Sequence, residues 1–343
     1  MNTRWLDHLR AQGAHIDDGK ALDFGDPEGE LVAARDATVI APLTQFGLIG
    51  CAGDDARSFL HNQLTSDVNH LGAAGAQYAA WCSAKGRMLA SLLLFCRGAE
   101  YLALLSSDLP EFILKRLQIY VLRSKVSLAD RSADSAIIGL AGPRAGAALE
   151  NAGLAAPAAA PGMTGFAGGV LIRLDEKRYI ILATADAAKQ TWQKLSAAAS
   201  PAGAPAWQWL DIQAGIPWVT EATREAFVPQ MTDFDRIGGV SFHKGCYPGQ
   251  EVVARARYLG KVKRHLYRTR AAAPLAAGMP VFPAGTPDQA CGQIANAAAA
   301  PGGHYDALAV ILEDALGQGE LWAALPGDGR VGLADPVRVR EPA

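Results

Sequence analysis

The sequence predicts an α+β fold that ends in a small β-barrel. Before Tyr267, helical and strand-like segments are interspersed, without the long series of strand–helix units that builds a parallel sheet. After Tyr267, short apolar runs are separated by glycine and proline turns, which is typical of a small barrel. A chain of 343 residues, half of them hydrophobic, is long enough for two or three domains. We therefore place a domain boundary near residue 268.

The N-terminal part predicts a helix and a β-hairpin. Asp54 is placed to cap a helix, because apolar residues recur at helical spacing over 59–68. Two apolar runs, 78–82 and 88–96, flank a short polar turn that contains Gly86. A pair of apolar runs around a glycine turn is typical of a hairpin.

The middle of the chain predicts a second helix and a strand-rich segment. Asp108 followed by Glu111 is a capping-box pattern, so we expect a helix to begin there. Alanine- and proline-rich stretches at 152–162 and 197–206 lack hydrophobic periodicity and are interpreted as connectors. Between them lie strand-like apolar runs and then a predicted helix near 187–195.

Charge, cysteine content and the absence of nucleotide motifs exclude several function classes. The 32 basic residues nearly balance the 34 acidic ones, so no net field draws the protein to nucleic acid or to an anionic membrane. The five cysteines are scattered and never spaced as C-x-x-C, which argues against a disulfide framework or a closed zinc site. Neither a G-x-G-x-x-G motif nor a P-loop occurs, and neither a signal peptide nor an apolar run of roughly 20 residues is found. We expect a cytoplasmic protein with no membrane contact, no metal site and no direct nucleic-acid partner.

The most informative segment is a turn that sets a thiol beside a lysine. It comprises Lys244, Gly245, Cys246, Tyr247, Pro248, Gly249, Gln250 and Glu251. A neighbouring cation stabilises a thiolate, and His243 and Lys244 are close enough in sequence to lower the pKa of Cys246. The glycines and the proline predict a tight, exposed turn. A second interpretation stays open, in which Cys246 is simply a small buried hydrophobic residue.

The turn and its flanks resemble the signature of one protein family. Gly238 to His243 lead into the turn, and Val252 to Arg255 follow it. Three upstream segments, 59–68, 82–88 and 122–126, occur in the expected order. Together these segments resemble the YgfZ-type folate-binding proteins, which belong to the glycine-cleavage T-protein (aminomethyltransferase) superfamily.

The resemblance implies the fold in more detail. It implies a T-protein-like folate-binding region over 1–268, with mixed and antiparallel sheets, helices and ferredoxin-like subdomains. Two intertwined subdomains are expected within it, roughly 1–50 with 130–268, and 51–129. Residues 269–343 are expected to form the C-terminal β-barrel domain.

The resemblance also implies a function. It implies a tetrahydrofolate-binding accessory protein that assists assembly or repair of iron-sulfur proteins, including enzymes that thiolate tRNA, with no independent turnover expected. Its partners are then a reduced folate and iron-sulfur client or assembly proteins. We expect Cys246 to act, since a thiolate can ligate iron transiently, accept sulfur or form a mixed disulfide. In this hypothesis Lys244 lowers the pKa of Cys246, and Gln250 with Glu251 orients the turn or a ligand.

Several positions depart from the patterns of the superfamily. The transferase branch carries a catalytic aspartate where this chain has Ala90, and Lys-Gly-Asp where this chain has Lys-Gly-Cys at 244–246. Without that carboxylate, no obvious group steers charge at the folate nitrogen during aminomethyl transfer. YgfZ-type proteins commonly show an arginine and a glutamate in the segment where this chain has Asp211 and Gln213, a change that bears on folate affinity.

Candidate folate-binding residues come from a basic segment and from the aromatic residues. After the turn, Arg255, Arg257, Lys261 and Lys263 share one parity, which predicts a strand with one basic face. That face is suited to the carboxylates of a folate tail or to a phosphate, although a charged edge strand that resists aggregation has the same pattern. A pterin needs a stacking surface and fixed hydrogen-bonding groups, although most large aromatic residues are core. The candidates are Trp209, Gln213, Tyr258, Arg255 and Arg257, followed by Trp207, Trp218, Tyr247, Asp175 and Glu176.

Two alternative functions stay open. One is an active one-carbon transferase, for which His61 and Asp67 are the nearest replacements for the missing acid by motif order. Release of formaldehyde or a methylene group from a folate adduct distinguishes this alternative. The other is a non-catalytic interaction module with a vestigial cavity, which binds no reduced folate in calorimetry.

Overall fold

Two compact units make up the protein, and each takes segments from separate parts of the sequence. The computed structural model describes residues 2–260, 262–324 and 329–340. One unit comprises Met1–Phe59, Asn69–Gln77 and Leu93–Trp207, and the second comprises Leu60–Val68, Tyr78–Leu92 and Gln208–Ala343. The predicted thiol turn and the five leading cofactor candidates all fall in the second unit.

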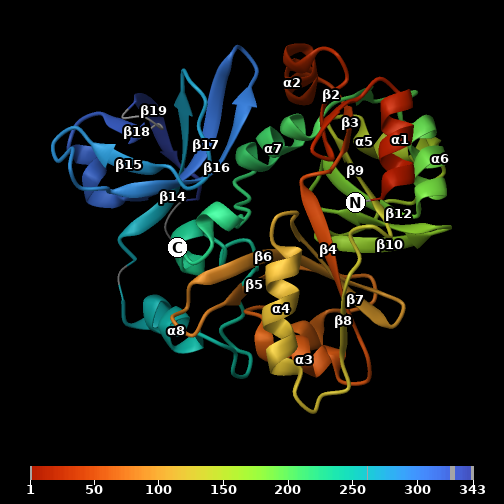
Figure 1. Ribbon diagram of the computed structural model, residues 1–343, viewed down its shortest axis with the longest axis horizontal. Coiled ribbons are helices and arrows are strands. Elements are labelled where there is room, and N and C mark those ends of the chain that lie inside the picture. Colours follow the sequence, from red (N-terminus) through yellow and green to blue (C-terminus); the bar gives the residue numbers. More distant parts are fainter. Residues whose placement is uncertain (1, 261, 325–328, 341–343) are drawn as a thin grey trace. The chain divides into compact units, whose positions relative to one another are not determined.

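The first unit contains a six-stranded sheet with helices packed on it. The strand order is β10 (Gly162–Phe166), β11 (Gly169–Arg173), β12 (Arg178–Ala183), β9 (Ala136–Ala141), β3 (Val39–Pro42) and β13 (Ser200–Pro201). The same unit holds α1 (Thr3–Ala11), β1 (His15–Asp17), β2 (Lys20–Asp23), α2 (Pro27–Asp36), α5 (Ala145–Asn151) and α6 (Ala185–Leu195). Helices α1 and α6 lie side by side, with buried Trp5 and Trp192 in edge contact (Figure 1). The predicted helix near 187–195 is confirmed.

A five-stranded sheet carries the predicted hairpin. Its order is β5 (Ala76–Cys82), β6 (Met88–Arg97), β7 (Glu100–Ser106), β4 (Phe46–Ala52) and β8 (Ser127–Asp130), accompanied by α3 (Ala56–Gln63), η1 (Val68–His70) and α4 (Pro110–Val121). Strands β5 and β6 form the hairpin, and its Gly86 has φ +69°, so that prediction is confirmed. Helix α4 begins as predicted, but its N-cap is Leu109, which makes no side-chain capping bond.

The C-terminal part of the second unit is a closed β-barrel, as predicted. Its strand order is β14 (Arg264–Ala271), β17 (His304–Leu312), β16 (Gly292–Ala300), β15 (Pro280–Pro283), β18 (Leu321–Ala324) and β19 (Arg330–Arg338), with η4 (Glu313–Gly317) after β17. Its core contains Ile294, Ala309 and Ile311. Closure removes unpaired strand edges. The barrel strands are drawn in blue in Figure 1.

One prediction in the second unit is wrong, because the basic segment after the thiol turn is not a strand. Its residues form helix α8 (Gln250–Tyr258), which follows α7 (Ala204–Gln213), η2 (Glu221–Thr223) and η3 (Pro229–Thr232) in the chain. Arg255 and Arg257, two positions apart, therefore point in different directions instead of sharing one face. Alanines at 254 and 256 favour a helix, and Gly249 at its N-cap adopts the left-handed conformation that starts it. Lys261 lies outside the described residues.

Candidate functional site

Helix α8 begins at Gln250, so the name thiol turn is kept for residues 244–249. Segment 61–66 anchors the residues that lead into this turn. Thr65 is fully buried at the centre of this junction. Its hydroxyl donates to the Gly239 carbonyl at 2.5 Å and accepts from the Ala80 N–H at 2.8 Å. The Ser241 N–H donates to the Thr65 carbonyl at 2.9 Å. One short side chain therefore holds strand β5 and the residues before the turn together.

Lys244 closes the same junction with its ammonium group. Its Nζ donates to three backbone carbonyls, those of His61, Leu64 and, at 3.0 Å, Ser66. They lie in the last turn of α3 and the loop after it, where carbonyls lack intrahelical partners. The Nζ atom also lies 5.1 Å from the centre of the Tyr247 ring. Burial lowers the pKa of Lys244 to about 8, and the charge of Asp67 opposes this change.

Two glycines let the thiol turn and the β5–β6 hairpin pack backbone against backbone. Gly249 has φ +81°, and a Cβ there would lie 2.3 Å from the Ser83 carbonyl oxygen. A Cβ on Gly86 would lie 2.8 Å from the Cβ of Val252. Both contacts are too short for any larger residue. Helix α8 therefore begins directly against the hairpin turn, immediately after the thiol.

The side chains that follow the thiol complete the turn. The Tyr247 N–H donates to Oε1 of Gln250 at 3.3 Å, so the first residue of α8 bonds back into the turn. Burial, together with the nearby Cys82, raises the pKa of the Tyr247 hydroxyl above its usual range. Glu251 is exposed in the first turn of α8. The predicted orienting role is thus supported by geometry for Gln250, while that of Glu251 stays a prediction.

Cys246 differs from the other four cysteines, all of which lie in the described part of the chain. Its side chain is exposed, whereas Cys51, Cys82 and Cys291 are buried and Cys96 is half-buried. Burial raises the pKa of both Cys51 and Cys82 to about 12, so neither is a thiolate near neutral pH. The interpretation of Cys246 as a buried hydrophobic residue is therefore wrong.

Two of the predicted cofactor residues are already bound within the protein. Nε1 of Trp209 donates to Asp306 at 2.9 Å, and Nε2 of Gln213 donates to the same carboxylate oxygen at 2.7 Å. Asp306 lies on β17 and is buried. Asp211 similarly accepts from Nε1 of Trp218 at 3.0 Å. The two bonds to Asp306 join α7 to the barrel, a structural role that the sequence pattern did not indicate.

The other predicted cofactor residues lie on α8. Tyr258 is 63% exposed and meets Phe242 edge-on at 6.1 Å, while the Arg257 guanidinium lies 5.5 Å from the same ring. Arg255 instead lines a cavity of about 370 Å³. Trp209 and Gln213 thus belong to the α7–β17 junction, and Tyr258, Arg255 and Arg257 belong to the α8 surface.

A buried carboxylate that sequence reasoning missed lies just before the thiol turn. Asp233 is 1% exposed, and its backbone is left-handed with φ +53°. Among the described residues, its Oδ2 atom has no hydrogen-bond partner, and its Oδ1 lies 3.8 Å from Nε of Arg236. Burial raises the pKa of Asp233 to about 6, although Arg236 and Arg340 oppose the change. The only hint in the sequence is the Asp–Arg pair three residues apart.

Next to Asp233 in the sequence, Phe234 belongs to a cluster of aromatic rings. Tyr78 meets Phe234 at 6.2 Å and Trp218 at 6.3 Å, both edge-on. All three rings are buried. A residue with an acceptor atom that has no donor among the described residues thus directly precedes a ring of this cluster, and acceptor atoms and flat apolar surfaces are what a heteroaromatic ligand requires.

Two kinds of feature are absent from the described residues. No group of three or more histidine, cysteine, aspartate or glutamate side chains is arranged to hold a metal ion. No described helix has the length and hydrophobicity needed to span a membrane.

Comparisons with known proteins bear on the whole arrangement. The model of the GCVT N-terminal domain family matches residues 23–164. The tRNA-modifying protein YgfZ of Yersinia pseudotuberculosis is 35% identical over 227 residues, which cover 66% of this chain and 68% of that protein. YgfZ of Cronobacter sakazakii is 33% identical over 243 residues, covering 70% and 74%. This chain belongs to the YgfZ family.

The YgfZ family shares its fold with the aminomethyltransferases. The crystal structure of glycine cleavage system aminomethyltransferase T from Bartonella henselae aligns with a TM-score of 0.80, covering 98% of this chain and 96% of that one. Its sequence identity is 16%, so the likeness concerns the fold. The predicted T-protein-like fold with a terminal barrel is therefore confirmed.

Four further predicted positions of this YgfZ family member can now be placed. Ala90, where the transferases are expected to carry an aspartate, is fully buried in β6. His61 and Asp67 form a pair, with Nδ1 3.2 Å from Oδ1, close to the carbonyls that bind Lys244. In the first unit, Asp175 lies between β11 and β12 and binds Nε of Arg178 at 2.6 Å.

Proposed function

We propose that this protein is a reduced-folate-binding accessory protein that assists assembly or repair of iron-sulfur proteins through the Cys246 thiol. The observation that carries the proposal is the presentation of this thiol. Cys246 is exposed, while its turn is held by Lys244 on three carbonyls and by Gly249 against the hairpin. The YgfZ relatives are named tRNA-modifying proteins, and the clients we propose are iron-sulfur enzymes that thiolate tRNA.

A single exposed thiolate suits transient work on iron. It can occupy one coordination position of an iron atom and leave again without the chelate effect of a multi-cysteine site. Such an exchange of ligands needs no oxidant, because the thiolate supplies and recovers its own electron pair. The described residues offer no group of three or more metal-binding side chains that would retain the iron.

Lys244 acts in this proposal chiefly as a positioning residue. We predicted that it lowers the pKa of Cys246, and that role remains a prediction. Its ammonium protons are directed at the carbonyls of segment 61–66, so its removal takes one donor away from each of these three acceptors. The position of the thiol depends on the same three bonds.

The reduced folate is assigned to the region of Asp233. Its free Oδ2 can accept from the N–H groups of a pterin, and Tyr78, Phe234 and Trp218 supply aromatic surface beside it. This place fits a pterin better than Trp209 and Gln213 do, because those side chains are already bound to Asp306. A bound folate supplies one-carbon chemistry, whereas the residues named here bind and orient it.

The thiol is tested by complementation in a strain that lacks the gene. We expect Cys246→Ser to restore little iron-sulfur enzyme activity, and Cys96→Ser, which alters the half-buried cysteine, to restore it fully. Full activity with Cys246→Ser refutes the role of the thiol.

The folate site is tested by titration with tetrahydrofolate, following tryptophan fluorescence. We expect Asp233→Leu to abolish the quenching and Lys244→Ala to leave it unchanged, because Lys244 belongs to the turn. Unchanged quenching in Asp233→Leu removes that residue from the cofactor site. No quenching in the wild type favours an interaction module instead.

One observation favours a second candidate function. The His61–Asp67 pair is the arrangement by which a carboxylate orients a general base, as a one-carbon transferase requires. The buried Ala90, which offers no carboxylate, weighs against that function. Formaldehyde release from a methylene-folate adduct, lost in His61→Gln, is the result that establishes it.

A further inference from the structure

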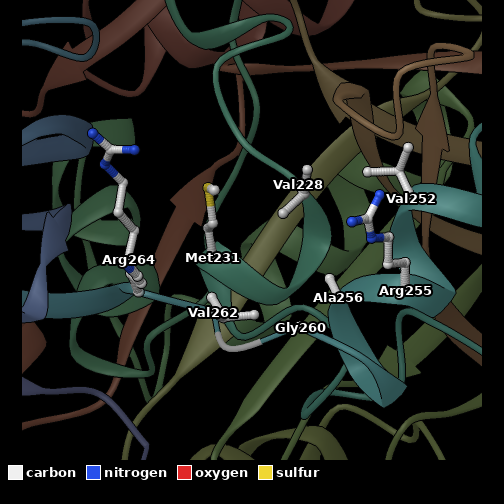
Figure 2. Close-up of a pocket in the computed structure, with 9 residues that line it drawn as sticks. Val228, Met231, Val252, Arg255, Ala256, Gly260, Val262 and Arg264 are labelled. Atoms are coloured by element: carbon white, nitrogen blue, oxygen red, sulfur yellow. The ribbon is translucent and has the colours of Figure 1, made fainter.

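A cavity of about 370 Å³ lies beside α8 in the second unit. Its lining is mostly aliphatic, from Val228, Met231, Val252, Ala256 and Val262. Figure 2 shows Arg264 and Arg255 on either side of Met231 and Val228, with Val262 below them. A smaller cavity of about 190 Å³ shares Met231 and Arg264 with it, so two flexible side chains separate the two spaces.

Three cations at the rim have no counter-charge. Among the described residues, Arg255, Lys263 and Arg264 form no ion pair and no side-chain hydrogen bond. The Glu313 N–H donates to the Lys263 carbonyl, but the Glu313 carboxylate is paired with His265 and Arg338. Residues 250–264 carry five basic residues and a single acidic one. An occupant of the cavity therefore needs an apolar body and negative charge around it.

The surface around the cavity extends beyond the reach of a small ligand. Val252, Tyr258 and Leu259 are 40%, 63% and 86% exposed along and just after α8. Val252 also lines the cavity, and exposed apolar side chains next to a cavity are typical of a surface that a protein partner covers. A small anion that filled the cavity would leave Tyr258 and Leu259 in water. A polypeptide that crosses α8 covers them as well.

We propose that α8 and this cavity form a docking groove for an acidic segment of a partner protein. One aliphatic side chain of that segment enters the cavity, and flanking carboxylates meet Arg255, Lys263 and Arg264. Helix α8 has nine residues, a length of about 13 Å, and begins four residues after Cys246. A segment held there brings its protein within reach of the thiol. The identification of this partner as the iron-sulfur client rests on the proposed function; the groove itself does not.

The groove is tested by fluorescence anisotropy with a labelled synthetic peptide in which glutamates flank two leucines. We expect it to bind the full-length protein more weakly as salt is added. Binding is expected to fall about tenfold in the double variant Lys263→Gln with Arg264→Gln, and also in Leu259→Ser. The matched control is Arg4→Gln with Arg35→Gln, which removes two exposed cations of the first unit and leaves binding unchanged. Circular dichroism melting checks that every variant is folded.

Three outcomes overturn the groove. They are no binding to the wild type, equal binding to the double variant, and equal binding of peptides whose leucines are replaced by serine. Tighter binding of a labelled single-stranded RNA, lost in the same double variant, assigns the cations to nucleic acid and also overturns it.

Complementation separates the two proposals. If Cys246→Ser fails to restore the iron-sulfur enzyme while the double variant restores it fully, the function stands without the groove. If the peptide results hold and Cys246→Ser restores full activity, the groove stands and the proposed function fails.

Discussion

At the scale of single residues, the thiol turn is held in place by side chains that hydrogen-bond to the backbone of other segments. Lys244 is beside Cys246 in the sequence, yet its ammonium group is occupied by three carbonyls of another segment. Thr65 holds two segments with one hydroxyl. Proximity in the sequence indicated which residues form the candidate site. The direction of each side chain, however, depends on contacts with residues far away in the sequence.

We predict that Lys244→Met destabilises the protein by about 1–3 kcal/mol, because it removes three part-buried hydrogen bonds to backbone carbonyls. Urea denaturation measures the change. Lys85→Met at the exposed hairpin tip is the matched control and should leave the midpoint unchanged. Equal midpoints for both variants contradict the role assigned to the Lys244 ammonium.

The raised pKa of Asp233 predicts a difference in stability between the wild type and Asp233→Asn that depends on pH. Because burial raises its folded pKa to about 6, above the reference value of 3.8, the charged form costs stability above pH 6. That cost disappears as the pH falls through 6 towards 3.8. Asp233→Asn should therefore stabilise the protein near pH 8 by about 3 kcal/mol, and by much less near pH 4.

Denaturation of wild type and Asp233→Asn at several pH values checks this prediction, with the exposed Asp288→Asn as the control. A stability gain that does not depend on pH shows that the carboxylate is not the cause.

At the scale of elements, the decisive feature is the close approach of α8 to the β5–β6 hairpin. Gly249 ends the thiol turn in a left-handed conformation, and the absence of a side chain on Gly86 leaves room for Val252 to pack against it. Two glycines far apart in the sequence thus position one helix. The turn glycines were recognisable from the sequence, whereas their mutual contact was not, since nothing local relates position 86 to position 249.

Gly249→Ala should destabilise the protein by about 2 kcal/mol or more, because it combines a strained φ with a clash against the Ser83 carbonyl. Gly245→Ala is the matched control. Its φ is not in the left-handed region, and its Cβ would lie 3.9 Å from the His61 ring. Chemical denaturation should separate the two variants, and equal effects contradict the packing described.

The same scale explains the wrong strand at 254–263. Alternation of basic and small residues is compatible with a strand, but alanine, arginine and valine also build a helix when a turn starts one. Gly249 and the hairpin contact start it here. In a helix, residues two positions apart are separated by more than half a turn, so the basic residues do not share one face. Arg255 therefore lines the cavity, whereas Arg257 lies over the Phe242 ring.

At the scale of the whole molecule, the cysteines predict how the native protein reacts with thiol reagents. Cys246 is exposed, and the remaining cysteines are buried or half-buried with raised pKa values. Ellman's reagent should modify Cys246 rapidly and Cys51, Cys82 and Cys291 only on unfolding. Mass spectrometry locates the label, and a rapid phase that persists in Cys246→Ser contradicts the exposure described.

The sequence by itself determined the fold class, the hairpin and the terminal barrel, because these depend on local periodicity and on glycine and proline chemistry. The tertiary structure alone decided three facts. Lys244 binds backbone carbonyls, Trp209 and Gln213 both donate hydrogen bonds to Asp306, and the Oδ2 atom of buried Asp233 has no hydrogen-bond partner among the described residues. Each of those facts joins residues distant in the chain. Burial and hydrogen-bond satisfaction are properties of the packed molecule, and no local pattern contains them.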